Sequence, residues 1–209
     1  MNESVRSELE TALVPSPRGY RTLVPPGYHN SLPLLLLLHG GGGSSEFLVQ
    51  MQPMIEQAWA SGSLPPLAVA TLDAERSFYL DYADGSERWE TFVLREWLPH
   101  LRETLPVDPR PAATLIAGIS MGGHGTIRIG LRYPEEFVAM AAMEPAVMPA
   151  LTLAEVPAAN LEFQQSVLEA RYGSPPDAWW NVNNPAHIAE VHAESIRATG
   201  IAIYLEVGT

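Results

Sequence analysis

A serine between two glycines is the residue of this sequence best suited to chemistry. Residues 118–122 read Gly-Ile-Ser-Met-Gly, and Ser120 stands at the centre of this pattern. In a sharp strand-to-helix turn the outer glycines avoid collisions with neighbouring chain, and the serine hydroxyl is pushed outward, where it can act as a nucleophile. The following helix favours negative charge at its first N–H groups. The alternative is an ordinary glycine-rich turn, with Ser120 a mere turn residue.

Four consecutive glycines supply a second signal. Residues 40–43 are all glycine, and they follow His39 and a run of five leucines over residues 34–38. Their backbone N–H groups are unobstructed, so such a loop can donate hydrogen bonds to an oxygen that becomes negative during acyl transfer. A flexible Gly-Ser linker over residues 40–45 is the alternative. A linker seldom follows a buried strand so directly inside one domain, so the sequence favours the donor loop.

Both signals require strands that end where helices begin. Residues 114–119 are apolar or small and predict a buried strand, and apolar spacing after Ser120 predicts a helix that ends before Pro134. Other strands are predicted over residues 20–24 (exposed, near a sheet edge), 34–38, 67–72, 137–143 and 201–207. Further helices are predicted over residues 47–61, 89–105, 161–172 and 185–199, with a turn region over residues 179–185. In the first of these helices Met51, Met54, Ile55, Ala58 and Trp59 are expected on one inward face.

This alternation predicts one α/β domain over residues 1–209, with a mostly parallel central sheet and helices on both faces. The ligand-facing loops of such a sheet follow the strands. Tyr79 and Tyr82, on the loop after residues 67–72, are therefore candidates to line a substrate pocket, with turn and packing roles as the alternative. Trp89 and His124 are further pocket candidates. Glu90 could touch the pocket, but a solvated or capping role is favoured.

Composition excludes several classes of protein. The chain has 209 residues, 46% of them hydrophobic and 17% charged, so a folded globular domain is expected. The net charge of −12 disfavours nucleic acid and anionic membrane surfaces as partners. The chain has no cysteine, which rules out a thiol nucleophile and cysteine-based metal sites. The start lacks the pattern of a signal peptide and the longest apolar run is too short to span a bilayer, so a cytoplasmic protein without membrane contact is expected.

Together these motifs resemble the putative-esterase branch of the α/β-hydrolases. The run Ser-Met-Gly-Gly-His-Gly from Ser120 is similar to esterase D (S-formylglutathione hydrolase), and Trp-Glu-Thr-Phe from Trp89 is similar to the mycolyltransferases; feruloyl esterases belong to the same branch. The resemblance implies that Ser120 is the nucleophile. It also implies an oxyanion hole made by the N–H groups of Met121 and of Gly41, with Gly42 as a further donor, and no metal or organic cofactor.

The resemblance also predicts a catalytic acid and then a histidine, in that order after the serine. The family places both after a strand like residues 201–207, so we expect them beyond Thr209, together with one strand and a closing helix. Asp177 with His187 or His192 has the right order, but the two histidines are five residues apart on a predicted helix and do not share a face. His124 and His39 are expected to bond locally.

The leading function is therefore hydrolysis of a small carboxylic ester or thioester through an acyl-Ser120 intermediate, with acyl transfer as a variant. A non-catalytic module or inactive fragment is the alternative. A flavin- or nucleotide-binding fold is disfavoured, because neither glycine run matches G-x-G-x-x-G in the first strand–helix unit. Residues 201–207 would form an unpaired sheet edge, which favours association between copies of the chain.

Overall fold

The computed structural model describes residues 3–29, 31–147, 171, 173 and 178–208. The predicted helix over residues 161–172 lies outside this part of the chain except for Arg171, and so does Asp177.

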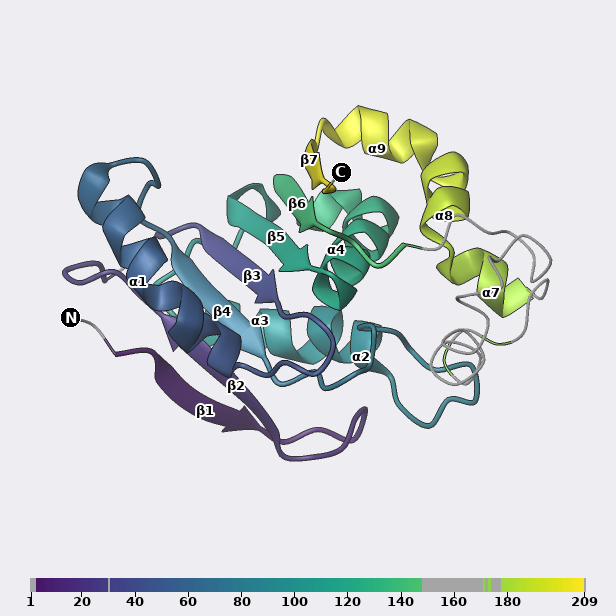
Figure 1. Cartoon of the computed structure of the whole chain (residues 1–209), viewed down its shortest axis with the longest axis horizontal. Coiled ribbons are helices and arrows are strands. Elements are labelled where there is room, and N and C mark those ends of the chain that lie inside the picture. Colours follow the sequence, from purple (N-terminus) through teal and green to yellow (C-terminus); the bar gives the residue numbers. More distant parts are fainter. Residues whose placement is uncertain (1–2, 30, 148–170, 172, 174–177, 209) are drawn as a thin grey trace.

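A seven-stranded sheet organises the described residues (Figure 1). Its order is β1-β2-β4-β3-β5-β6-β7, with β1 and β2 antiparallel to their neighbours and the other strands parallel. The strands are β1 (Val5–Leu9), β2 (Arg18–Leu23), β3 (Leu34–Leu38), β4 (Ala68–Leu72), β5 (Thr114–Ile119), β6 (Ala139–Met143) and β7 (Ala202–Glu206). The predicted mostly parallel α/β sheet is confirmed.

Helices cover both faces of this sheet (Figure 1). They are α1 (Glu46–Ser61), α2 (Trp89–Phe92), the π-helical turn η1 (Val93–Trp97), α3 (Leu98–Thr104), α4 (Met121–Arg132), α7 (Ala178–Asn183), α8 (Pro185–Val191) and α9 (Ala193–Thr199), with short 3-10 turns η2 (Pro111–Ala113) and η3 (Pro134–Glu136). None of the described helices combines the length and the apolar character needed to cross a bilayer.

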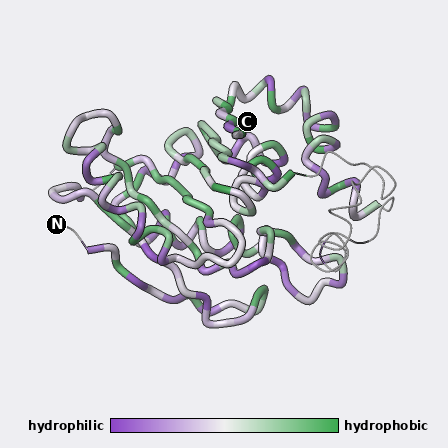
Figure 2. The backbone as a smooth tube through the Cα atoms, in the orientation of Figure 1, coloured by the Kyte–Doolittle hydropathy of each residue, from purple (hydrophilic) through white to green (hydrophobic). Residues whose placement is uncertain are grey.

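The central strands are buried because both of their faces are covered. Leu34, Leu36 and Leu38 of β3 pack in the larger core with α4 and the α2–α3 segment, whereas Leu37 belongs to a smaller core with Leu48 of α1. Figure 2 shows the hydrophobic residues concentrated along these central strands. Polar and apolar residues do not alternate along the leucine run, because apolar side chains pack against both faces of this strand.

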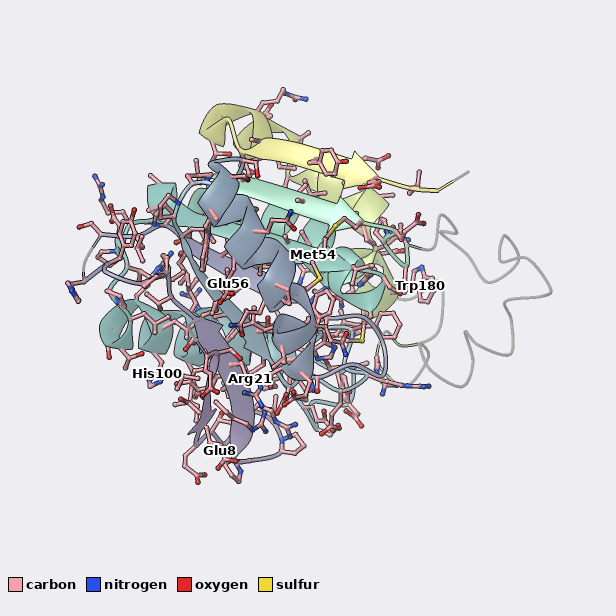
Figure 3. All side chains as sticks on the ribbon, turned by 60° about the vertical axis from the view of Figure 1, so that its left-hand side comes forward. Glu8, Arg21, Met54, Glu56, His100 and Trp180 are labelled. Carbon is pink, nitrogen blue, oxygen red and sulfur yellow. The ribbon has the colours of Figure 1, made fainter. Side chains whose placement is uncertain are left out.

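Four details of the sequence prediction are corrected. Residues 178–183 form helix α7 rather than a turn, because Trp180 is drawn into the core, where it is 2% exposed. The helix predicted over residues 185–199 is divided at His192, whose backbone leaves the helical conformation. Strand β2 lies next to the edge strand β1, as predicted, but it is mostly buried rather than exposed. Met54 is 62% exposed on α1 and does not join the inward face (Figure 3).

Candidate active site

Ser120 occupies the turn between β5 and α4, as the sequence predicts. Its φ of 55° and ψ of −115° lie in a region that a non-glycine residue rarely adopts. Hydrogen bonds hold this conformation: its N–H donates to the carbonyl of Met143 at 2.9 Å, and its carbonyl accepts from the N–H groups of His124 and Ala146. The side chain is exposed at the carboxyl edge of the sheet. The fold therefore holds the backbone of Ser120 in a strained conformation that presents its hydroxyl to solvent.

Gly118 and Gly122 explain how helix α4 can approach the sheet so closely. A Cβ atom on Gly122 would lie 2.1 Å from the carbonyl oxygen of Leu38, at the end of β3. A Cβ atom on Gly118 would lie 2.4 Å from the backbone carbonyl carbon of Gly122. Only glycine fits at these two positions. The collisions that the sequence analysis expected for larger residues there are therefore present in the structure.

The glycine loop lies directly beside Ser120. The Cβ position on Gly40 is 3.4 Å from the Cβ atom of Ser120, and that on Gly41 is 4.0 Å from the Cβ atom of Met121. A hydrogen bond from the N–H of Gly43 to the carbonyl of Gly40, at 3.0 Å, closes the loop into a turn. Among the described residues, no backbone acceptor is assigned to the N–H groups of Gly41, Gly42 or Met121. These three groups are thus free to bind an external oxygen.

His39 fixes the start of this loop. It is completely buried, its Nδ1 lies 2.7 Å from the carbonyl oxygen of Gly40, and its Nε2 accepts from the N–H of Ala74 at 3.0 Å. Burial lowers its pKa from the ordinary 6.5, although the Gly40 contact opposes this. Nδ1 therefore carries the proton, and both ring nitrogens are used structurally. His39 bonds locally, as predicted, and in doing so it orders the loop; it is not placed to take a proton from Ser120.

Asp73 joins the glycine loop to the N-terminal strand. Its carboxylate accepts from the N–H of Ser45 at 2.6 Å and from the guanidinium of Arg6 at 2.7 Å. Burial raises its pKa, but these hydrogen bonds outweigh burial and the net pKa is lowered. The sequence analysis did not single out this residue, because no local pattern links Asp73 to residues so distant in the chain.

A buried ion cluster fixes α4 against α2. Glu90 is 5% exposed and accepts from Arg132 at 2.9 Å and from the hydroxyl of Tyr133 at 2.9 Å, and it also pairs with the completely buried Arg128. Burial raises the pKa of Glu90, but the two arginines outweigh it and keep the carboxylate ionised. Arg128 in turn donates to the side chain of Asn183 on α7 at 3.0 Å. Glu90 is a structural anchor, so the favoured prediction of a solvated role is wrong, and its carboxylate is occupied by the arginines rather than presented to a pocket.

The pocket candidates differ in exposure. Tyr82 is half-buried in the loop after β4, with the guanidinium of Arg171 5.1 Å from the centre of its ring. Trp89 is 1% exposed and His124 2% exposed, the latter packed edge-on against Phe78 at 5.7 Å between ring centres. Side chains enclosed in this way present no surface to a substrate, so Trp89 and His124 are corrected to core residues.

No described side chain forms a hydrogen bond with the Oγ atom of Ser120. His192 is the C-terminal cap of α8, and its carbonyl accepts from Ser195 at 2.9 Å. The structure places Ser120 together with Gly40, Gly41 and Met121, and it assigns no general base among the described residues.

A cavity of about 350 Å³ adjoins the glycine loop on the side of α1. It is lined by residues 39–44 together with Glu46, Phe47 and Gln50, and Ser120 is not part of its lining. It therefore lies behind the proposed donor loop rather than in front of the serine.

Burial of His124 predicts a pH dependence of stability. Burial, and then the charge of Arg128, lower its pKa from 6.5 to about 3. Below about pH 6.5 the unfolded chain binds a proton that the folded chain excludes, so stability present above this pH is lost as the pH falls. Between about pH 7 and pH 5 this loss is about 2 kcal/mol for one histidine.

Urea unfolding of the wild type and of His124→Phe at these two pH values measures the effect. The variant should lose about 2 kcal/mol less than the wild type over the interval. His39 contributes with the same sign to both proteins and cancels in the comparison. Equal losses would contradict a neutral, buried His124.

Comparisons with known proteins agree with this geometry. A family model described as putative esterase matches residues 11–209. An acetyl esterase of Caldicellulosiruptor saccharolyticus is 37% identical over 82 residues, which are 39% of this chain and 31% of that relative. The match therefore spans about a third of the length of that protein.

Two solved structures show the same fold. FphF, a fluorophosphonate-binding serine hydrolase of Staphylococcus aureus, superposes with a TM-score of 0.74 at 16% identity, covering 99% of this chain and 91% of that one. An S-formylglutathione hydrolase from Agrobacterium tumefaciens gives a TM-score of 0.71 at 19% identity, covering 96% and 84% of the two chains. At these identities the likeness concerns the fold alone.

Proposed function

Because this chain belongs to the putative esterase family, we propose that it is a serine esterase acting on a small carboxylic ester or thioester through an acyl-Ser120 intermediate. The observation that carries the proposal is the exposed Ser120 at a strained turn, beside N–H groups of Gly41 and Met121 that have no assigned backbone acceptor. Strain of this kind persists only where the surrounding structure enforces it.

The proposed reaction follows from this arrangement. The Oγ atom of Ser120 adds to the carbonyl carbon of the ester, its proton passes to a water molecule that can return it to the leaving group, and the former carbonyl oxygen becomes negatively charged. The N–H groups of Met121 and of Gly41, with Gly42 beside it, donate hydrogen bonds to that oxygen. Loss of one such donor costs on the order of 3 kcal/mol of transition-state stabilisation. The alcohol or thiol then leaves with a proton, and water releases the acyl group from Ser120.

The first alternative is a non-catalytic module with the same fold. Its supporting observation is that no described residue bonds the Oγ atom of Ser120, and a serine without a base is a weak nucleophile. Acyl transfer to an acceptor other than water is the second alternative, because both reactions share the acyl-enzyme step.

Labelling with a fluorophosphonate reagent distinguishes a serine esterase from a non-catalytic module of the same fold. We expect one covalent adduct, and peptide mass mapping should place it on Ser120. Hydrolysis of a neutral para-nitrophenyl ester should be lost in proportion to labelling. A folded protein that gains no adduct and hydrolyses no ester would exclude the proposed esterase.

A cytoplasmic location and the association of copies through β7 remain predictions from the sequence. The strand forms an outer edge of the sheet, and its residues Ile203, Tyr204 and Leu205 are exposed. Such an edge leaves backbone groups open to pairing with another chain.

A further inference from the structure

Arg76 lies on the loop that follows β4, next to the glycine loop. Its side chain is exposed, and its Nη2 atom lies 3.8 Å from the position that a Cβ atom on Gly42 would take. Because the turn from Gly40 to Gly43 is closed by a hydrogen bond, Gly42 is close to Gly40, which touches Ser120. Adjacent Cα atoms are only about 3.8 Å apart, so the Cα atoms of Gly40 and Gly42 are at most about 8 Å apart and the guanidinium lies within about 18 Å of the Ser120 side chain.

The loop that carries Arg76 is held from several sides. Ala74 donates its N–H to the buried His39, and the hydroxyl of Tyr79 donates to the carbonyl of His39 at 3.3 Å. Ser77 accepts from the N–H of Tyr79 at 3.0 Å, and Arg128 donates to the carbonyl of Tyr79 at 2.5 Å. These contacts fix the backbone on both sides of Arg76, so the base of its side chain is held beside the donor loop.

Arg76 forms no ion pair with another described residue. Seven arginines form ion pairs with carboxylates there, and Arg76 is not one of them. Its neighbour Glu75 pairs with Arg18 at 2.9 Å instead. In a chain with a net charge of −12, Arg76 thus places beside the glycine loop a guanidinium that has no ion-pair partner among the described residues. Such a cation attracts anions toward the site and can bind a carboxylate through two parallel hydrogen bonds.

We propose that Arg76 is a specificity-determining residue that binds a carboxylate of the substrate, so that the enzyme prefers anionic esters or thioesters over neutral ones of the same size. This inference rests on the proposed serine esterase activity. The carboxylate belongs to either the acyl group or the leaving group.

Two matched substrate pairs distinguish these sources. In the first pair, mono(para-nitrophenyl) glutarate carries a carboxylate on its acyl group, and para-nitrophenyl valerate is the neutral ester with which it is compared. The second pair, para-nitrophenyl acetate with and without a ring carboxylate, places the charge on the leaving group. For at least one pair, Arg76→Ala should lower kcat/KM for the anionic ester about tenfold or more and change the neutral ester less than about twofold.

The matched control is Arg197→Ala, which removes the same charge from an exposed position on α9. Helix α9 leads into the amino end of β7. Because β7 is parallel to its neighbour β6, this end of the strand lies opposite the carboxyl ends, where Ser120 is found. Arg197→Ala should leave both ratios unchanged, whereas Arg76→Lys should retain part of the preference. Added salt should reduce the preference of the wild type, because the pair is exposed. Equal losses on anionic and neutral esters, or none on either, would overturn the role of Arg76.

Binding separates this inference from the esterase activity itself. On a Ser120→Ala background, where the esters stay intact, calorimetry should show weaker binding of the anionic ester when Arg76 is also replaced, and unchanged binding of the neutral one. Selective binding without turnover in the wild type would reject the esterase and keep the anion site. Turnover of both esters without a preference for the anionic one would keep the esterase and reject the anion site at Arg76.

Discussion

Replacing Ser120 with alanine should reduce kcat/KM for a neutral para-nitrophenyl ester by at least about 10³-fold, because no acyl-enzyme can form without the hydroxyl. Alanine keeps the Cβ atom and faces the same backbone φ of 55° as serine, so the turn itself should be retained. The residual rate reports what the N–H groups of Gly41 and Met121 contribute without a nucleophile. Steady-state hydrolysis, together with fluorophosphonate labelling, measures the effect.

Ser195→Ala is the matched control for this variant. Ser195 lies on α9, where its hydroxyl donates to the carbonyl of His192 at 2.9 Å. Its loss should leave both hydrolysis and labelling intact. If Ser120→Ala hydrolysed the ester within a few-fold of the wild-type rate, another residue would be the nucleophile and the proposed mechanism would fail.

Gly122→Ala should destabilise the protein by several kcal/mol, roughly 3 or more, and abolish activity with it. The added Cβ atom would lie 2.1 Å from the carbonyl oxygen of Leu38 and 2.7 Å from that of His39. Both are backbone atoms of a central strand and its exit, which cannot swing aside as a flexible side chain could. Within a helix, alanine is normally favoured over glycine by about 0.5–1 kcal/mol, so a loss would be due to the collision. Denaturant unfolding measures the change.

Gly41→Ala is the control for stability. Its Cβ atom would meet only the Cβ atom of Met121, at 4.0 Å, which is an ordinary contact. Unfolding free energy should then change by less than about 1 kcal/mol. If Gly122→Ala were as stable as Gly41→Ala, the close approach of α4 to β3 would not exist in solution.

Local patterns were sufficient for much of this fold. The leucine run, the Gly-Ile-Ser-Met-Gly turn and the capping glycines Gly62 and Gly200 specify strands and helix ends through interactions within a few residues. Both glycines adopt the left-handed conformation expected of helix C-caps, at φ of 73° and 67°. Such signals are readable because the physical cause lies in the chain segment itself.

Contacts between distant segments decided the rest. Trp89 and His124 look like pocket residues in a list of loops and helix starts, yet both are enclosed by the core. Glu90 looks like a surface or capping carboxylate, and only folding brings Arg128 and Arg132 to it. Burial depends on which elements meet across the sheet, and no local spacing encodes that.

The candidate site divides in the same way. Glycine spacing and apolar runs are local requirements, so they were enough to predict that Ser120 stands at a strand-to-helix turn and that a glycine loop follows a buried strand. Only the tertiary structure decided that the two loops touch, that His39 is locked in a structural role, and that Arg76 lies over Gly42. These depend on the parallel pairing of β3 with β4 and β5, which brings three chain segments to one edge of the sheet.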